Sequence, residues 1–224
     1  MQNRFKILIY TEIAYIILSV IFALLIRSIL HLMMGFNMFL ALIPFYLTYR
    51  LKKTKQIKTI TFILIFIVWL LFFPNTFYFL TDLIHVTKLN IYYYQNTGID
   101  SVIVYFEDII EWLKLAHLML GSIGGALLGL ASLYEMQQIL ESRKVKFINY
   151  ILVGIIILSG VGIYIGRFLR FNSWDIFNPY MIFKTLLLRF NLFALLFILL
   201  ISTIISVFYF TFYHIIKERV NVQD

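Results

Sequence analysis

The chain has 224 residues, of which 62% are hydrophobic and only 13% are charged. An ordinary soluble domain is roughly 45–50% apolar, so this composition excludes that class and indicates a protein that crosses a membrane several times. The net charge of +8 does not indicate nucleic-acid binding, because the basic residues cluster at the ends of apolar runs, where Lys and Arg orient membrane helices. Cysteine is absent, which excludes disulfides, thiolate metal sites and thiol nucleophiles.

Six apolar segments are long enough to cross a bilayer, which takes about 20 helical residues. The first is too long for a secretory signal core of about 7–15 residues, so we expect a retained span. The second is the least regular, because it contains His31, Asn37 and Pro44, and five spans is the alternative count. The sequence predicts an all-α bundle in one integral-membrane domain over residues 1–224. Its spans are expected at about 7–26, 31–49, 59–80, 114–134, 147–166 and 190–213.

Lys and Arg are distributed unequally between the two sides of this bundle. With six spans, the side that holds both termini carries 12 of them and the other side carries 7. The positive-inside rule therefore predicts cytoplasmic termini, and we expect a multi-pass protein of a bacterial cytoplasmic membrane. Four of the seven outward residues lie in one loop, where they either anchor the chain at the interface by snorkelling or act outside. These four are Arg167, Arg170, Lys184 and Arg189.

Two outward connections have further features. The one between the third and fourth spans is acidic and rich in tyrosine, which suits a membrane interface, and its carboxylates are positioned to pair with the arginines of the fifth loop. In that loop, Asn178 and Pro179 read as an N-cap and a first helical residue. We expect an interfacial helix from there to about Arg189, followed by the sixth span. The acidic residues are Asp100, Glu107, Asp108 and Glu111.

The third span carries a polar stripe that begins at Pro74, where the missing N–H predicts a break in the helix. Asn75, Tyr78, Asp82 and His85 fall within an arc of about 80° at 100° per residue and should face the bundle interior. Asp82 and His85 are neighbours at i and i+3, and an aspartate beside a histidine can orient it or share a metal with it. The equal alternative is a helix-end hydrogen-bond cluster without chemistry.

The fourth span carries a second stripe, in which glycines at every fourth position let another helix approach closely. A similar pair, Gly162 and Gly166, lies in the fifth span. Outward from the glycines, the stripe becomes polar and predicts a vestibule. The stripe consists of Glu107, Glu111, Lys114, His117, Gly121, Gly125 and Gly129.

A metal site is conceivable from the types of side chain present, since oxygen and imidazole ligands suit several divalent ions. Its members would be Asp82, His85, His117 and Glu111. Nothing in their spacing demands such a site, so the sequence predicts no metal and no other cofactor.

Arg167 and Arg170 follow the fifth span at i and i+3, and paired guanidinium groups suit phosphate or carboxylate. Asn172, Trp174 and Asp175 follow within a few positions. Three interpretations remain open. The arginines form a structural ion pair with Asp82, Asp175 or the acidic loop, they bind an anionic lipid headgroup or lipid-linked phosphate, or they take part in catalysis.

The segments FFPNTFYFLTDLIHV (72–86) and GIYIGRFLRFNSWD (162–175), with the GLASLY ending of the fourth span, resemble the bacterial integral membrane proteins grouped as domain of unknown function 1361. Thr76, Phe77 and Phe171 stand where the resemblance leads us to expect Ala, Pro and Trp, which affects packing more than polar chemistry. The family implies no activity. Residues that fall on its motif positions are Pro74, Asn75, Tyr78, Thr81, Asp82, His85, Arg167, Arg170, Asn172, Ser173, Trp174 and Asp175.

The leading hypothesis is the binding or transport of an anionic lipid-like or small anionic ligand in an outward pocket at the ends of spans three to five. One alternative is a membrane-embedded enzyme acting on a lipid-linked substrate, with Asp82 and His85 as its acid–base pair. Another is a non-catalytic subunit with a membrane-protein partner. The expected ligand contacts are Asn75, Tyr78, Asp82, His85, Arg167, Arg170, Asn172, Trp174 and Asp175.

Overall fold

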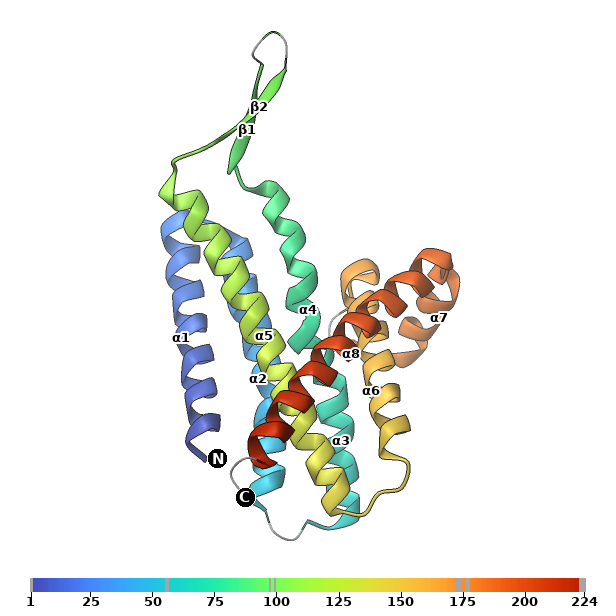
Figure 1. The fold of residues 1–224 in the computed structure, drawn as a ribbon. Coiled ribbons are helices and arrows are strands. Elements are labelled where there is room, and N and C mark those ends of the chain that lie inside the picture. The colour runs from blue at the N-terminus through green and yellow to red at the C-terminus, as the bar shows by residue number, and fades with distance from the viewer. Residues whose placement is uncertain are drawn as a thin grey trace.

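The computed structural model describes residues 2–54, 57–96, 98, 100–171, 175 and 178–221. Long helices that pack along one another make up most of it (Figure 1). They are α1 (Gln2–Ile26), α2 (Ile29–Lys53), α3 (Thr59–Phe72), α4 (Pro74–Asp82), α5 (Ile109–Ser142), α6 (Ile148–Tyr164), α7 (Pro179–Arg189) and α8 (Leu192–Asn221). A 3₁₀ helix, η1 (Leu83–Lys88), continues α4, and a π-helical turn, η2 (Ile165–Leu169), continues α6.

Six helical segments are long and apolar enough to cross a membrane, which confirms the predicted all-α, multi-pass architecture. The irregular second segment is one of them, so the count is six. Helix α1 begins and α8 ends at the same end of the bundle (Figure 1). Which side of the membrane that end faces remains a prediction. The segments are Phe5–Ile26, Ile29–Lys53, Thr59–Lys88, Ile109–Ser142, Ile148–Leu169 and Leu192–Glu218.

The third span is divided at the predicted position, since α3 ends at Phe72 and α4 begins at Pro74. Proline has no N–H to donate to the preceding turn. Two residues further on, the Thr76 amide donates a hydrogen bond to the Phe73 carbonyl, at 3.1 Å. A short helix also follows Asn178 as predicted, while its place at the membrane interface stays a prediction. It is α7, and the side chain of Asn178 caps it by accepting a hydrogen bond from the Met181 amide.

The connection between η1 and α5 contains a β-hairpin, which the all-α prediction did not include. Strand β1 (Tyr92–Asn96) pairs antiparallel with β2 (Ser101–Tyr105) in the register Tyr92 to Tyr105, and the hairpin projects beyond the helices (Figure 1). Aromatic and β-branched residues favour strands, and both strands are rich in them. The interfacial place that the sequence analysis expects for these tyrosines stays a prediction, and it does not take their strand preference into account.

The core beside the predicted kink is a ladder of aromatic rings along α3 and α4. The rings of Trp69 and Phe73 stack with centroids 4.6 Å apart, and Phe77 meets Phe73 edge-on at 5.7 Å. The indole of Trp69 also donates a hydrogen bond to the hydroxyl of Ser132 on α5, at 2.9 Å. Because all of these side chains are buried, the ladder fixes α4 against α5 and sets the position of the polar residues that follow.

Candidate functional site

The site begins with a close approach between α6 and α4. A Cβ added to Gly162 would lie 2.8 Å from Cγ of Pro74, and one added to Gly166 would lie 3.1 Å from Cε2 of Tyr78. The predicted glycine pair therefore acts as a packing surface. It holds the π-helical turn after α6 beside the last turn of α4, and so brings together two segments that are far apart in the sequence.

Arg167 is fixed by four contacts from this arrangement. Its Nη2 donates to Oδ1 of Asp82 at 2.5 Å and to Oγ1 of Thr81 at 2.7 Å, and its Nε donates to the same threonine oxygen at 3.0 Å. The guanidinium carbon lies 4.4 Å from the centroid of the Tyr78 ring. The side chains of Asp82 and Arg167 are only 6% and 18% exposed, so each charge neutralises the other in a largely desolvated position.

The second oxygen of Asp82 is bound from another helix. Oδ2 accepts a hydrogen bond from Nδ2 of Asn37 on α2, at 3.3 Å. His85 makes no hydrogen bond to this carboxylate within the described part of the chain, and its buried Nδ1 has no partner there. Asp82 and His85 therefore line the same cavity without forming a hydrogen bond to each other. The carboxylate bonds to Arg167 and Asn37 instead.

These groups line a cavity of about 1110 Å³ between α2, α4 with η1, and the end of α6, which we call the arginine cavity. One wall is polar and one is apolar. The polar wall contains Asn75, Tyr78, Asp82, His85, Lys88, Arg167 and Arg170. The apolar wall comes mainly from α2 and includes Leu32, Met33 and Phe36, whose side chains are otherwise exposed on the outer face of the bundle.

Arg170 ends the π-helical turn in a left-handed conformation, with φ of 60°. This conformation costs an ordinary residue roughly 1–2 kcal/mol relative to the right-handed one. The side chain is exposed, lines the arginine cavity and has no hydrogen-bond or ion-pair partner among the described residues. Backbone strain of this kind persists where the surrounding structure enforces it, often at ligand sites.

Most of the residues predicted from sequence lie together in this cavity. Asn75, Tyr78, Asp82, His85, Arg167 and Arg170 all line it. Asn172 and Trp174 lie outside the described residues. Asp175 is described but does not line the cavity, and its carbonyl accepts a hydrogen bond from the Asn178 amide at 2.8 Å.

Two cavity residues were missed. Asn37 was noted only as an irregularity of the second span, although a lone amide in an apolar helix is itself a signal of a buried polar contact. Lys88 was counted only for topology. Both line the cavity.

Among the described residues, the polar part of the α5 stripe is engaged in side-chain contacts and does not line the arginine cavity as a vestibule. His117 is 1% exposed and lies 2.9 Å from the Ser19 hydroxyl and 3.0 Å from Nδ1 of His31. Glu111 pairs with Lys114 at 2.6 Å. None of these α5 side chains lines the arginine cavity. The reason is that this face of α5, outward from its glycines, packs against α1 and α2 rather than α4.

The four side chains considered for a metal site are accordingly divided between separate clusters. Asp82 and His85 face the arginine cavity, and His117 lies among α1, α2 and α5. Over the part of the chain that the structure describes, no three His, Asp or Glu side chains are grouped so that they could hold a metal ion.

The fold and the arginine cavity define a multi-pass α-helical membrane protein with a charged cavity at one end of the bundle. Residues 36–208 match the family described as protein of unknown function (DUF1361), and the chain belongs to that family, as the polar motifs indicated. The match includes Asn37, Asp82 and Arg167. No curated protein and no solved structure matches the chain.

Proposed function

We propose that this protein binds an anionic lipid-like ligand in the arginine cavity, for retention or transport within a bacterial cytoplasmic membrane. In this proposal the chain is one integral-membrane domain with both termini in the cytoplasm, and the cavity lies at the outward end. The ligand carries a phosphate or carboxylate on an apolar body.

The single observation that carries the proposal is the state of Arg167. A guanidinium has five N–H groups, and Arg167 uses those of Nε and Nη2 on Thr81 and Asp82. Its Nη1 has no hydrogen-bond partner among the described residues. The side chain is therefore held in a fixed orientation with two donors left for a ligand, which is the arrangement that suits recognition of an oxyanion.

The charge of the cavity also favours an anion. Lys88, Arg167 and Arg170 line it, and Asp82 is the acidic residue that does so. Asp82 neutralises one of the three cations through its ion pair with Arg167. The side chain of Lys88, like that of Arg170, makes no hydrogen bond or ion pair with any described residue. The lining thus has an excess of positive charge close to a dry region, where electrostatic attraction is weakly screened.

The apolar wall supports an amphiphile over a small soluble anion. Leu32, Met33 and Phe36 line the cavity and are also exposed on the surface of α2, which faces hydrocarbon in a membrane-spanning helix. An acyl or prenyl chain lying along α2 keeps its contact with the bilayer interior while its charged headgroup reaches the arginines.

The test compares Arg170→Gln with Lys184→Gln in the purified protein. Lys184 is an exposed basic residue of α7 that does not line the cavity, so it controls for the loss of one charge. We expect phosphatidylglycerol, added to delipidated protein in detergent, to raise the melting temperature of wild type and Lys184→Gln more than phosphatidylcholine does. Arg170→Gln should reduce that difference, because it removes the contribution of the arginine cavity. An unchanged difference in Arg170→Gln contradicts the proposal.

The proposed orientation has its own test, because the natural chain contains no cysteine. A single Cys at Asp100, between the two strands of the hairpin, should react with an impermeant thiol reagent added outside intact cells. A single Cys at Lys144, after α5, should react only after the membrane is opened. The reverse pattern overturns the orientation but leaves the cavity itself in place.

A second candidate function is a membrane-embedded enzyme acting on a lipid-linked substrate, and the observation that favours it is His85. Its buried Nδ1 has no partner among the described residues, and the side chain lines the same cavity. An imidazole with a free ring nitrogen beside bound substrate can act as a general base. With the arginines holding the anionic group, the reaction would be a hydrolysis or transfer at that group.

Binding and catalysis are separated by His85→Gln, which removes the base and keeps a hydrogen-bonding side chain. If the protein only binds its ligand, this variant should keep the stabilisation by anionic lipid and any cellular phenotype. Loss of the phenotype with retained lipid stabilisation favours the enzyme.

A further inference from the structure

We propose a second anion site at the opposite end of the bundle, which holds the phosphate of an anionic phospholipid in the other leaflet. It is a pocket of about 830 Å³ between the end of α2 and the end of α5, which we call the α2–α5 pocket. Its polar lining includes Lys52, Thr54, Lys58, Ser142 and Arg143. This site does not depend on the function proposed for the arginine cavity.

Arg143 is held in a defined position within this pocket. Its Nη2 donates to the carbonyl oxygen of Ile57 at 3.1 Å, and its guanidinium carbon lies 4.2 Å from the centroid of the Phe62 ring. The N–H groups of Nε and Nη1 have no hydrogen-bond partner among the described residues. As with Arg167, a fixed guanidinium retains donors for an oxyanion, and the attraction between the cation and the Phe62 ring helps to hold it in place.

The pocket carries a net positive charge. Lys52, Lys58 and Arg143 line it, and no acidic residue does so within the described chain. Lys52 forms an ion pair with Glu135 on α5. The nearby carboxylate of Glu141 accepts hydrogen bonds from the amides of Gln137 and Gln138. At least Lys58 and Arg143 therefore remain to attract an anion.

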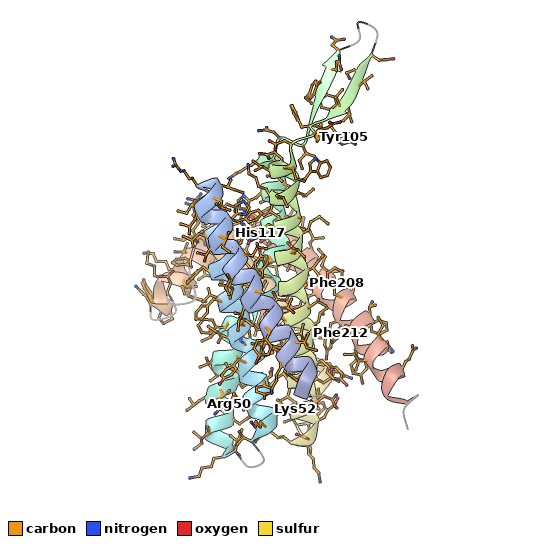
Figure 2. The ribbon with its side chains drawn as sticks, turned by 90° about the vertical axis from the view of Figure 1, so that its left-hand side faces the viewer. Arg50, Lys52, Tyr105, His117, Phe208 and Phe212 are labelled. Carbon is orange, nitrogen blue, oxygen red and sulfur yellow. The ribbon has the colours of Figure 1, made fainter. Side chains whose placement is uncertain are left out.

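The position of the pocket along α5 places it at the other membrane surface. Ser122 of α5 bonds to the Phe79 carbonyl beside the arginine cavity, at 3.0 Å, and Ser142 lines the α2–α5 pocket. Twenty helical residues span about 30 Å, which is the thickness of the hydrocarbon core. Figure 2 likewise shows Lys52 at the end of the molecule opposite Tyr105.

The residues beside these cations favour a lipid, rather than free phosphate, as the source of the bound phosphate. Leu51, Ile57 and Ile139 line the pocket beside the cations, which provides an apolar surface for the glycerol and upper acyl region. Basic pockets between membrane helices on the cytoplasmic side bind anionic headgroups, since that leaflet is rich in them. The predicted orientation of this chain puts the α2–α5 pocket on that side.

The test measures binding of phosphatidylglycerol to delipidated full-length protein by native mass spectrometry. The variants are Lys58→Gln and Arg143→Gln, and the matched control is Lys144→Gln. Lys144 follows Arg143 directly but does not line the pocket. Each of the first two should weaken binding at this site by about five-fold, as expected for one basic contact, and Lys144→Gln by less than two-fold. The side chain of Lys58 makes no hydrogen bond or ion pair with a described residue, so its variant should fold normally.

Two further arms complete the experiment. Arg170→Gln should leave binding at the α2–α5 pocket intact, so failure at one cavity is distinguishable from failure at the other. Inorganic phosphate that displaces the lipid only at millimolar concentration supports lipid as the source, whereas equal affinity for free phosphate assigns the site to a soluble anion. Equal losses in all three lysine and arginine variants overturn the proposal, because they indicate diffuse attraction to the basic end of the bundle.

Discussion

Asp82 and Arg167 lie 85 residues apart in the sequence and are joined by a 2.5 Å hydrogen bond between Oδ1 and Nη2. The pair connects α4 to the end of α6, and Asn37 connects the same carboxylate to α2. Three of the six spans therefore meet at one nearly buried carboxylate, and the arginine cavity exists because they meet there.

The ion pair should be necessary for stability, because removing one partner leaves the other charged and desolvated. We expect Arg167→Ala to lower the free energy of unfolding by about 3–5 kcal/mol. The double variant Arg167→Ala with Asp82→Asn should recover part of this loss, since the stranded charge is removed. Unfolding in an SDS titration measures both, with Lys184→Ala as the control. A loss no larger than that of Lys184→Ala contradicts the structural role of the pair.

The contact between α4 and α5 should be intolerant of a side chain at Gly125. A Cβ there would lie 2.7 Å from the Thr76 carbonyl oxygen and 2.6 Å from Cδ2 of Phe79. The carbonyl oxygen belongs to the backbone of α4 and has little freedom to move away. We expect Gly125→Ala to cost about 1–3 kcal/mol of unfolding free energy. Gly154→Ala is the matched control, because no atom beyond its chain neighbours and its own helix backbone lies within 4 Å of its added Cβ. Equal stabilities of the two variants would show that the helices are not this close.

The buried histidine cluster should contribute through its hydrogen bonds. His117 bonds to both Ser19 and His31, and the Ser19 hydroxyl donates to the Tyr15 carbonyl at 2.8 Å. His117→Leu keeps a side chain of moderate size but leaves His31 without this partner, which should cost about 1–3 kcal/mol. His214→Leu, at an exposed position of α8, should have little effect on the same unfolding measurement. An unchanged unfolding free energy in His117→Leu would contradict this contribution of the hydrogen bonds.

Arg170 should show opposite effects on stability and on ligand binding. Glycine adopts φ of 60° without the penalty that Arg170 bears, so we expect Arg170→Gly to raise the unfolding free energy by up to about 1 kcal/mol. The same change removes a cationic group from the arginine cavity and should reduce stabilisation by phosphatidylglycerol. Arg170→Ala, which keeps the strain, should lose the ligand effect without gaining stability. Destabilisation by Arg170→Gly would argue against backbone strain at this residue.

The spans and the break at Pro74 could be predicted from the sequence because each depends on a local pattern. A run of about 20 apolar residues suffices for a span, and the missing proline N–H suffices for a break. An ion pair between Asp82 and Arg167 could also be predicted as one of several interpretations, since the span count and the distribution of Lys and Arg put both residues at the same end of the bundle.

The detailed partners were not accessible, because they depend on which helix faces which. The polar stripe of α5 could be drawn from periodicity, but periodicity does not say that its outer part meets α1 and α2, so His117 was assigned to the wrong surroundings. Asn37 reaches Asp82 only through the packing of α2 on α4. The hairpin was missed for another reason, since a short strand signal in a tyrosine-rich connection competes with the aromatic composition of a membrane interface.

The proposed anionic amphiphile lies along α2 with its headgroup at the arginines, and photo-crosslinking from α2 tests this placement most directly. A benzophenone side chain is placed at Met33, which lines the cavity, or at Leu199 of α8, which does not, both of them 50% exposed. In a bilayer of known composition, lipid captured at Met33 should be enriched in the anionic species, and Arg170→Gln should abolish that enrichment. Lipid captured at Leu199 should match the bilayer. If the lipid at Met33 also matches the bilayer, the arginine cavity does not select an anionic amphiphile.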